Sequence, residues 1–334
     1  MERPQARNSL AERGANPVRQ GPQLSRFAAV RGAEKRVLVT GARGFIGRQC
    51  LPHLAARGFE VHAVSSADAA QLGASWHRCD LLNAADATRL VERVRPTHLL
   101  HLGWIAQPGI FWTSRENLAW LAAGTELVQS FYGCGGTRAV GVGSCAEYAE
   151  SHSPCVEDVT PIAPSTPYGK AKDAMHRALR KAARERGSWA WARLFFPYGP
   201  GEATGRFIPS VIDGLLRGMP VDCTHGRQVR DFIYLDDVAE GCVALVDGSQ
   251  SGAYNIGSGE GRTLREVAAI IVAEIGHGEL VRFGARPAPE HDSAYVVADV
   301  SKARRDFGWS ARIGLGEGLR RTVAAHSALA KKVT

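Results

Sequence analysis

Short apolar runs alternate with longer amphipathic stretches along the chain, from residue 35 to about residue 200. Apolar runs bounded by Gly, Pro or Asp predict buried strands, and stretches with apolar residues three or four positions apart predict helices. The predicted strands are residues 35–40, 59–64, 76–80, 97–102, 138–143 and 189–196, and the predicted helices are 45–57, 84–94, 115–134 and 167–186. Because strands and helices alternate, the pattern predicts an α/β fold with a Rossmann-type, doubly wound parallel sheet.

The pattern changes after Pro197, where Pro, Gly and Arg become frequent and the apolar segments shorten. This change predicts a Rossmann domain over residues 35–200 and a smaller C-terminal, substrate-binding lobe over residues 201–330. Within that lobe, the apolar positions of residues 236–256 indicate that the chain returns once to the large sheet.

The positive charge is concentrated at the N-terminus. The formal net charge is +8, and residues 1–36 hold eight basic and three acidic side chains. The rest of the chain keeps 33 of the 41 basic and 30 of the 33 acidic residues, so it is nearly balanced. A nucleic-acid groove concentrates Lys and Arg on the folded domain, so no nucleic-acid partner is expected. Scattered Pro and Gly predict that residues 1–34 form a disordered basic extension.

Two further classes of protein are disfavoured. No stretch approaches the roughly 18 consecutive apolar residues of a membrane helix, so no membrane partner is expected. The seven cysteines form no C-x-x-C pair and no group with clustered histidines, which disfavours a metal site. Their odd number and scattered positions indicate reduced thiols and a cytoplasmic protein.

A glycine-rich turn joins the first predicted strand to the first predicted helix. The turn has the sequence GARGFIG, and its members Gly41, Arg43, Gly44, Phe45, Ile46 and Gly47 are candidate cofactor-binding residues. Glycines permit a tight turn and close approach of a pyrophosphate, and a helix N-terminus favours an anion. Three glycines in a turn also occur without any ligand, but this position opens a βαβ unit and predicts a dinucleotide site.

The choice between NAD and NADP depends on the end of the second strand. An NAD-binding protein usually places a carboxylate there to bind the ribose hydroxyl, whereas this chain has Ser65 and Ser66. Arg43 is a candidate to bind the additional phosphate of NADP, although it can equally be a solvated loop cation. We therefore predict NADP, with NAD as the alternative. Asp80 is a candidate partner of the adenine amino group, or else a helix N-cap.

A proton-handling set is predicted near the start of the helix 167–186. Tyr168 and Lys172 are four residues apart and so share one helix face. A nearby ammonium favours the phenolate form of a tyrosine and brings its pKa toward neutrality. Ser144, just after the fifth strand, can donate a hydrogen bond to the same substrate oxygen. We predict these three as catalytic residues, with Lys172 also contacting the cofactor.

The chain resembles the extended short-chain dehydrogenase/reductases of the NAD(P)-dependent nucleotide-sugar epimerase/dehydratase family, from about residue 35 to about residue 325. Besides the glycine-rich turn, the matching motifs are CDL (79–81), HLG (101–103), Asn117, GSCAEY (143–148), PYGKAK (167–172), RLFFPYGPG (193–201), RDFIYLDDV (230–238), YNIGSG (254–259) and ADVSKA (298–303). The resemblance implies that Ser144, Tyr168 and Lys172 perform hydride chemistry at a sugar carbon. It implies a nucleotide-diphosphate sugar as substrate and a homodimer, formed here by the helices 115–134 and 167–186.

The resemblance also assigns binding residues. Leu81, Leu102, Gly103 and Trp104 are implied to contact the cofactor, and Cys145, Phe196, Phe207, Arg230 and Arg286 the substrate. Arg230 is implied to bind the diphosphate, as a bidentate arginine suits two phosphates, although a structural ion pair is the alternative. Phe196 stands where many relatives carry an asparagine.

Departures from the family pattern narrow the reaction. Dehydratases place acidic residues directly after the catalytic Ser or Thr, whereas this chain has Cys145 and Ala146, so dehydration is disfavoured. We treat Glu147 as structural and Cys145 as a small buried thiol. The aromatic residues of the loop 104–112 predict a shaped sugar or base pocket.

The resulting prediction is an NAD(P)-dependent oxidoreductase that reduces the C4 keto group of a nucleotide-activated 4-keto-(6-deoxy)hexose. The first alternative is a 4-epimerase with tightly bound NAD, because the same three catalytic residues serve both reactions. A non-catalytic dinucleotide-binding regulator is a further alternative, disfavoured by the presence of both Tyr168 and Lys172.

Overall fold

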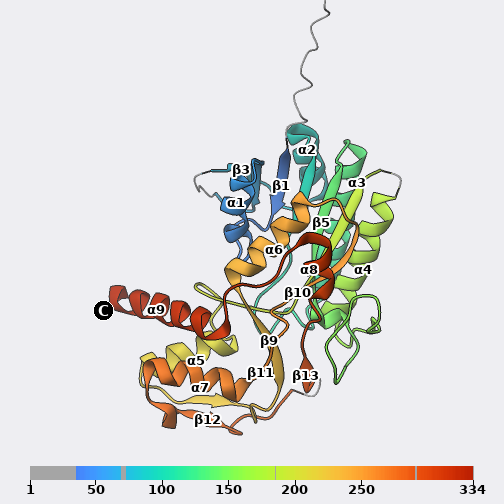
Figure 1. Ribbon diagram of the computed structural model, residues 1–334. Helices are drawn as coiled ribbons and strands as arrows, with labels where there is room; N and C mark the ends of the chain where they lie inside the picture. Colours follow the sequence, from blue (N-terminus) through green and yellow to red (C-terminus); the bar gives the residue numbers. More distant parts are fainter. Residues whose placement is uncertain (1–34, 69–72, 185, 290–291, 334) are drawn as a thin grey trace, which may run out of the picture. The chain divides into compact units, whose positions relative to one another are not determined.

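The computed structural model describes residues 35–68, 73–184, 186–289 and 292–333. The predicted disordered extension therefore lies outside the described residues. Within them, seven parallel strands form one sheet in the order β10-β6-β5-β4-β1-β2-β3 (Figure 1). These strands are β1 (Arg36–Thr40), β2 (Glu60–Ser65), β3 (Ser75–Arg78), β4 (His98–His101), β5 (Arg138–Ser144), β6 (Ser188–Leu194) and β10 (Gly252–Ile256).

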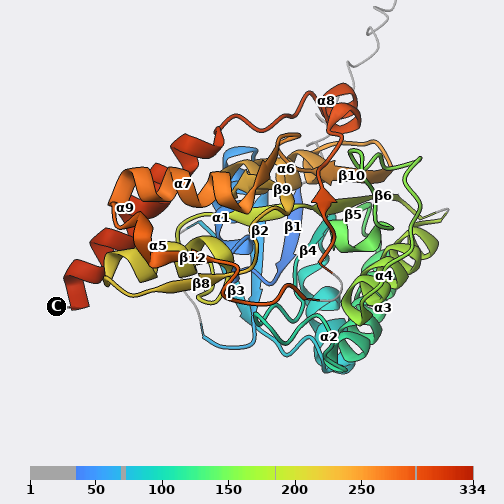
Figure 2. The ribbon, with the colours of Figure 1, turned by 90° about the horizontal axis from the view of Figure 1, so that it is seen from below.

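Alternate residues of the central strand β1 supply two hydrophobic cores. Val37 and Val39 pack in a core with residues of the helices α1 (Gly47–Ala56) and α6 (Leu235–Asp247). Leu38 packs in a second core with residues of α2 (Ala84–Val94), α3 (Glu116–Gly133) and α4 (Pro167–Ala183). Figure 2 shows α2, α3 and α4 together on one side of the sheet. Because successive side chains of a strand face opposite ways, both faces are covered, and the predicted doubly wound α/β fold is confirmed.

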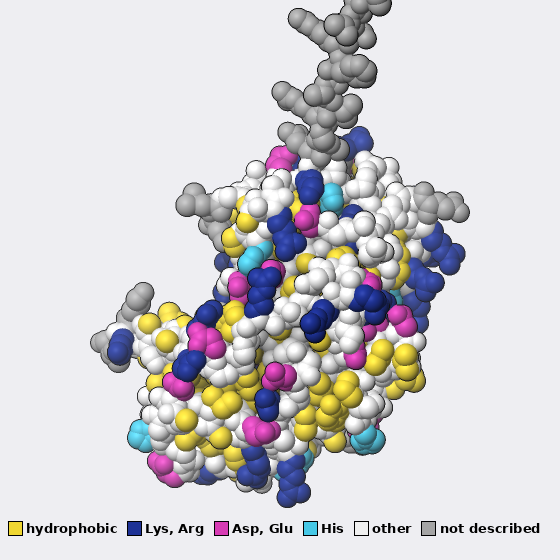
Figure 3. Space-filling view, viewed as in Figure 1, with side chains coloured by type: hydrophobic (Ala, Val, Ile, Leu, Met, Phe, Trp, Pro, Cys, Tyr) yellow, Lys and Arg dark blue, Asp and Glu magenta, His cyan; other side chains and the backbone are white. Residues whose placement is uncertain are grey.

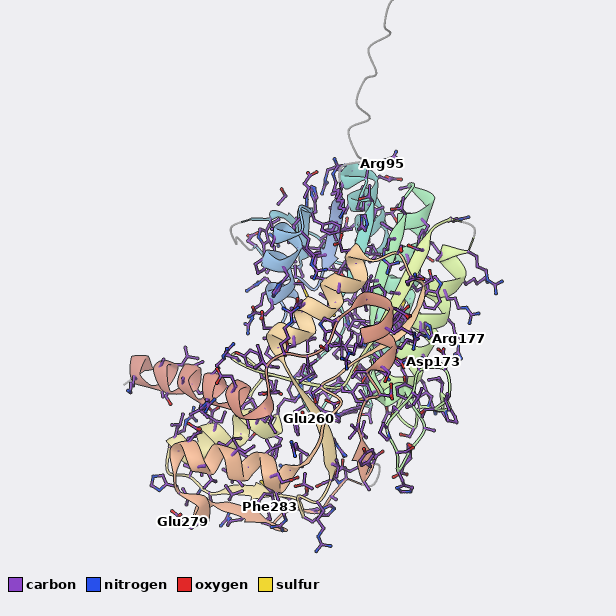
Figure 4. All side chains as sticks on the ribbon, viewed as in Figure 1. Arg95, Asp173, Arg177, Glu260, Glu279 and Phe283 are labelled. Atoms are coloured by element: carbon purple, nitrogen blue, oxygen red, sulfur yellow. The ribbon has the colours of Figure 1, made fainter. Side chains whose placement is uncertain are left out.

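Local signals determine where two of these helices begin and end. The Asn83 side chain accepts a hydrogen bond from the Asp86 amide at 3.3 Å and caps α2. The helix ends at Arg95, labelled in Figure 4, whose backbone is left-handed. The alternative that Asp80 caps this helix is therefore wrong. The Thr166 hydroxyl accepts a hydrogen bond from the Gly169 amide at 3.1 Å and caps α4. This cap places Tyr168 in the first helical turn.

The predicted single strand 189–196 is wrong in one respect. β6 ends at Leu194, and a second strand, β7 (Phe196–Tyr198), pairs with β9 (Val229–Tyr234) in a different sheet. Phe195, between the two, donates its amide hydrogen bond to Ile256 of β10 at 3.1 Å. A continuous apolar run predicts extended backbone but carries no signal for a change of partner strand.

The later part of the chain has a hydrophobic core of its own, formed chiefly by α5 (Phe207–Leu216), α7 (Leu264–Ile275) and α9 (Leu315–Val333). Figure 1 shows α7 beside β12, which pairs with β8 in a two-stranded sheet. The remaining elements are β8 (Val221–Cys223), β11 (Gly261–Thr263), β12 (Val281–Phe283), β13 (Tyr295–Val296) and α8 (Ser301–Phe307). β11 and β13 pair with β9, which carries the RDF motif into this part of the molecule.

Candidate active site

The glycine-rich turn packs tightly against the end of β4. Gly41 has a positive φ of 67°, and a Cβ placed on it would lie 2.9 Å from the Gly103 amide nitrogen. A Cβ on Gly47 would lie 2.2 Å from the Gly41 carbonyl oxygen. Only glycine permits both the conformation and the approach, so the turn is a backbone-lined cradle at the N-terminus of α1. These residues fit the pyrophosphate of a dinucleotide.

The residues implied to flank the cofactor lie around this turn. The Thr40 hydroxyl accepts a hydrogen bond from the Gly103 amide at 3.2 Å and joins the ends of β1 and β4. A Cβ on Gly103 would lie 3.0 Å from the Leu81 side chain, so the CDL motif (79–81) and the HLG motif (101–103) are in contact. Leu102 also lies beside the turn, because its carbonyl carbon would be 2.9 Å from a Cβ on Gly41.

The residues predicted to determine the preference for NAD or NADP lie at the surface. Arg43 is exposed, and no hydrogen bond or ion pair joins it to the residues that the structure describes. Ser65 ends β2, and its hydroxyl accepts a hydrogen bond from the Ala67 amide at 3.2 Å, while Ser66 is exposed. Asp80 is exposed and accepts a hydrogen bond from the Leu82 amide at 3.0 Å.

Ser144 and Tyr168 are brought together by a close approach of α4 to the end of β5. A Cβ on Gly169 would lie 2.3 Å from the Ala146 carbonyl oxygen, so glycine at this position lets the first turn of α4 reach the residues after Ser144. Burial raises the pKa of Tyr168, while hydrogen bonding to Ser144 and the positive charge of Arg206 act in the opposite direction. The Tyr168 hydroxyl is therefore protonated at neutral pH in this structure.

Lys172 lies on the same face of α4 but contacts other groups. Its Nζ donates a hydrogen bond to the Val142 carbonyl at 2.8 Å and lies 4.0 Å from the ring centroid of Trp104. It is 5.8 Å from the ring centroid of Tyr168. Burial lowers the pKa of Lys172 to about 7, although the negative charge of Glu147 acts in the opposite direction. Small changes around this ammonium therefore alter its charge near neutral pH.

The aromatic loop after β4 forms one wall of the site. The ring centroids of Phe111 and Trp112 lie 4.8 Å and 5.5 Å from that of Tyr168, both in edge-on geometry. The Tyr168 amide also donates a hydrogen bond to the Trp112 carbonyl at 3.2 Å. Trp104 donates from its indole nitrogen to Asn117 at 2.9 Å, and Asn117 in turn donates to the Phe111 carbonyl at 2.7 Å. The loop, the helix α3 and Tyr168 are thus held together.

The three residues after Ser144 form a short 3-10 helix with no free acid. Glu147 is fully buried, accepts hydrogen bonds from the Ser144 amide and the Trp191 indole, and forms an ion pair with Arg193 at 2.8 Å. These contacts use the carboxylate for structure. Burial raises the pKa of Cys145 to about 12, so its thiol stays protonated at neutral pH.

Arg230 lies in β9 and forms an ion pair with Asp292. Its guanidinium also donates to the Val229 carbonyl at 2.9 Å and lies 5.4 Å from the ring centroid of Phe196. Asp292 further accepts a hydrogen bond from Gln228. The side chain predicted to bind a diphosphate thus has a carboxylate partner here, in agreement with the structural alternative.

The remaining two candidates lie in the later part of the chain. Phe207 is the first residue of α5 and packs against the core of that part. Arg286 is exposed and follows β12, with its amide donating to the Cys223 carbonyl at 3.1 Å. The role of Arg286 and Arg230 as two ligands of one diphosphate therefore stays a prediction.

Two charged residues of this region, Glu202 and Arg206, were not predicted as site residues from the sequence. The Arg206 guanidinium lies 5.2 Å from the ring centroid of Phe111 and lowers the pKa of both Tyr168 and Glu202. Glu202 directly follows the motif RLFFPYGPG (193–201), and Arg206 lies five residues after it, in a segment without hydrophobic periodicity. No signal in that segment distinguishes them from the many other charged residues of the chain.

The described residues contain no cluster of His, Cys, Asp and Glu with the geometry of a metal site. No helix within them is both long and apolar enough to cross a membrane. All seven cysteines lie within the described residues and are free thiols. On the face drawn in Figure 3, Lys and Arg side chains lie interspersed with Asp and Glu.

Comparison with known proteins identifies the family of this chain. The model of the NAD-dependent epimerase/dehydratase family matches residues 37–257, more than half of the chain. The dTDP-glucose 4,6-dehydratase of Neisseria gonorrhoeae is 26% identical over 87% of this chain and 95% of its own length. UDP-glucose 4-epimerase 4 of Oryza sativa subsp. japonica is 26% identical over 89% of this chain and 91% of its own. The structure of MoeE5 in complex with UDP-glucuronic acid and NAD is 29% identical, with a TM-score of 0.79 over 88% of this chain and 99% of its own. The chain belongs to the NAD-dependent epimerase/dehydratase family.

Proposed function

We propose that this protein is an NAD-dependent epimerase that inverts one carbon of a nucleotide-diphosphate sugar through transient oxidation. The observation that carries the proposal is the grouping of Ser144, Tyr168 and Lys172 at the edge of the sheet beside the glycine-rich cradle. The positions directly after Ser144 hold no acid, and the Glu147 carboxylate is ion-paired, so this grouping suits oxidation and reduction better than loss of water. The similarity to a UDP-glucose 4-epimerase and to a protein solved in complex with NAD supports the proposal of an NAD-dependent epimerase.

In the proposed mechanism, the cradle from Gly41 to Gly47 holds the pyrophosphate, and Leu81, Leu102, Gly103 and Trp104 flank the dinucleotide. The chemistry that NAD supplies when bound is the acceptance and return of a hydride. Ser144 donates a hydrogen bond to the reacting sugar oxygen, and Tyr168 takes the hydroxyl proton of the sugar in its phenolate form, which burial disfavours and the Lys172 ammonium favours. The Lys172 ammonium stabilises the phenolate. In the return step Tyr168 would give the proton back to the same sugar oxygen.

A reductase that consumes NADPH is the second candidate. It is favoured by the absence of a carboxylate at Ser65 and Ser66 and by the exposed Arg43 beside the cradle. Both candidates use the same three catalytic residues, so they differ in the cofactor and in the balance of the reaction. The epimerase returns its cofactor unchanged, whereas the reductase oxidises one NADPH for each keto sugar.

The two candidates are separated by the cofactor that the purified protein carries and by its turnover. We expect bound NAD, released on denaturation, and interconversion of C4 epimers within a panel of UDP-, dTDP-, CDP- and GDP-sugars without net change in absorbance at 340 nm. Stoichiometric NADPH oxidation with a 4-keto sugar, and no epimer formation, would instead establish the reductase. Tyr168→Phe should abolish turnover and keep NAD binding, and unchanged turnover would refute the catalytic assignment.

We also propose a homodimer formed through α3 and α4. The two helices pack side by side in Figures 1 and 2, and Leu118 of α3 is 68% exposed. Asp173 and Arg177, neighbours on α4 in Figure 4, form an ion pair at 2.8 Å that would border such an interface. Sedimentation should give a dimer for the native chain and a monomer for Leu118→Glu, and a native monomer would contradict the proposal.

A further inference from the structure

One carboxylate in the described part of the chain has a buried oxygen without a hydrogen-bond partner. It belongs to Glu202, whose Oε2 is inaccessible to solvent and accepts no hydrogen bond. Burial of an unpaired carboxyl oxygen is unfavourable, and folded proteins usually satisfy such atoms. An exception beside an active site indicates a group whose partner arrives with a ligand. Burial raises the pKa of Glu202 to about 8, against the effect of Arg206, so this side chain can keep a proton near neutral pH.

The loop that carries Glu202 is anchored at both sides of the active site. It runs from Gly199 to Arg206, between β7 and α5. The Arg48 guanidinium, one residue after the glycine-rich cradle, donates a hydrogen bond to the Pro200 carbonyl at 2.7 Å. Near its other end, a Cβ on Gly205 would lie 3.9 Å from Pro108 of the aromatic loop. The loop therefore bridges the cofactor cradle and the aromatic wall around Tyr168.

Arg206 connects Glu202 to the reactive tyrosine. Glu202 lies four residues before Arg206 in the same loop, and the positive charge of Arg206 lowers the pKa of both Glu202 and Tyr168. Its guanidinium rests on the Phe111 ring, which is itself in edge-on contact with Tyr168. No direct ion pair joins Glu202 and Arg206, both of which the structure describes, so each keeps hydrogen-bonding capacity. Arg206 and the Phe111 ring thus connect the loop that carries Glu202 to the Tyr168 ring.

Resting on the proposed function, we propose that Glu202 and Arg206 form the subsite for the sugar ring of the substrate. The Glu202 carboxyl, as donor and acceptor, and the Arg206 guanidinium, as donor, hydrogen-bond ring hydroxyls next to the carbon on which Tyr168 acts. Phe111 and Trp112 provide the apolar contact that the carbon faces of a sugar require. A polyhydroxylated ring matches this mixture of donors, acceptors and aromatic surface better than a planar, uncharged ketone does.

The test compares the affinity of the protein for a nucleotide-diphosphate sugar with its affinity for the free nucleotide. The holoenzyme, saturated with NAD, is titrated calorimetrically with UDP, dTDP, CDP and GDP and with UDP-glucose, dTDP-glucose, CDP-glucose and GDP-mannose. For the best pair, the ratio of the two dissociation constants measures the contribution of the sugar. The variants are Glu202→Leu, which removes both oxygens, Glu202→Gln, which keeps a donor and an acceptor, and Glu279→Gln, an exposed control.

We expect Glu202→Leu to reduce this ratio about tenfold or more, to leave the affinities for the free nucleotide and NAD unchanged, and to melt at or above the native temperature. Glu202→Gln should retain part of the ratio, and Glu279→Gln all of it. An undiminished ratio in Glu202→Leu overturns the subsite. A parallel loss for the free nucleotide or for NAD overturns it too, because the carboxyl group would then belong to the nucleotide or cofactor site. If the native holoenzyme binds every sugar nucleotide with the same affinity as the free nucleotide, the proposed function itself fails. That outcome is seen in the native protein, whereas failure of the subsite alone is seen only in the Glu202 variants.

Discussion

Among single residues, Trp104 contacts the charged end of Lys172, which we propose as a catalytic side chain. Its ring lies 4.0 Å from Lys172 Nζ, and a cation–π contact favours the ammonium form that burial disfavours. Such a contact between desolvated groups contributes about 2 kcal/mol, equivalent to roughly one unit or more of pKa. Because turnover needs the ammonium, Trp104→Leu should move the alkaline limb of the kcat/KM profile about one pH unit lower.

The matched variant is Trp104→Phe, which keeps an aromatic face but loses the indole hydrogen bond to Asn117. If the ring acts through Lys172, the phenylalanine variant should shift the alkaline limb less than the leucine variant. Equal profiles for the native chain and Trp104→Leu would show that the ring does not affect the ionisation of Lys172. Equal shifts in both variants would instead assign the effect to the hydrogen bond.

The ion pair of Arg230 with Asp292 offers a second prediction for single residues. If Arg230 binds a diphosphate, the Asp292 carboxylate competes for the same guanidinium, and Asp292→Asn should tighten the binding of UDP or dTDP about tenfold. If the pair is structural, the variant should lose stability, because Arg230 is only 8% exposed, and nucleotide affinity should not rise. Calorimetry and thermal melting separate the outcomes. Asp222→Asn, which removes an exposed partner of Arg282, is the control.

For the elements, the contact between the glycine-rich turn and α1 determines whether the cofactor can bind. A Cβ on Gly47 would lie 2.2 Å from the Gly41 carbonyl oxygen, and backbone on both sides leaves no flexible group to move away. Gly47→Ala should therefore weaken NAD binding at least about tenfold, because α1 must shift from the pyrophosphate site. Gly133→Ala, in α3 with open space around it, should leave the affinity unchanged. Similar affinities for both variants would contradict this account of the cradle.

Elements that depend on local signals were predictable from the sequence, and contacts between distant elements were not. The helix 84–94 has the predicted limits, because its apolar positions mark it locally. The strand 189–196 was predicted as one element because a change of partner strand leaves no local trace. The same reason applies to the site. The spacing of Tyr168 and Lys172 is local, whereas the contacts of Arg206 with Phe111 and of Trp104 with Lys172 arise only when separate loops meet.

At the scale of the whole molecule, buried histidines should make the fold sensitive to acid. His176 of α4 stacks on Trp191 with ring centroids 5.4 Å apart and contacts the tilted ring of Trp189 at 5.3 Å, and its Nε2 is buried without a hydrogen-bond partner. Burial lowers the pKa of His176 to about 3, and the positive charges of nearby arginines, Arg193 foremost, act in the same direction. In the unfolded chain the same group has an ordinary pKa of about 6.5.

Between those two pKa values the unfolded chain binds a proton that the folded chain does not, so stability falls as the pH falls from about 6.5 toward 3. One such group contributes at most about 1.4 kcal/mol per pH unit. His176→Phe keeps the ring stack and removes the titrating nitrogen, so its free energy of unfolding should decrease less steeply in urea titrations between pH 6.5 and 4.5. The exposed His152→Phe should follow the native curve. A slope for His176→Phe equal to the native slope would mean that the acid sensitivity comes from other groups.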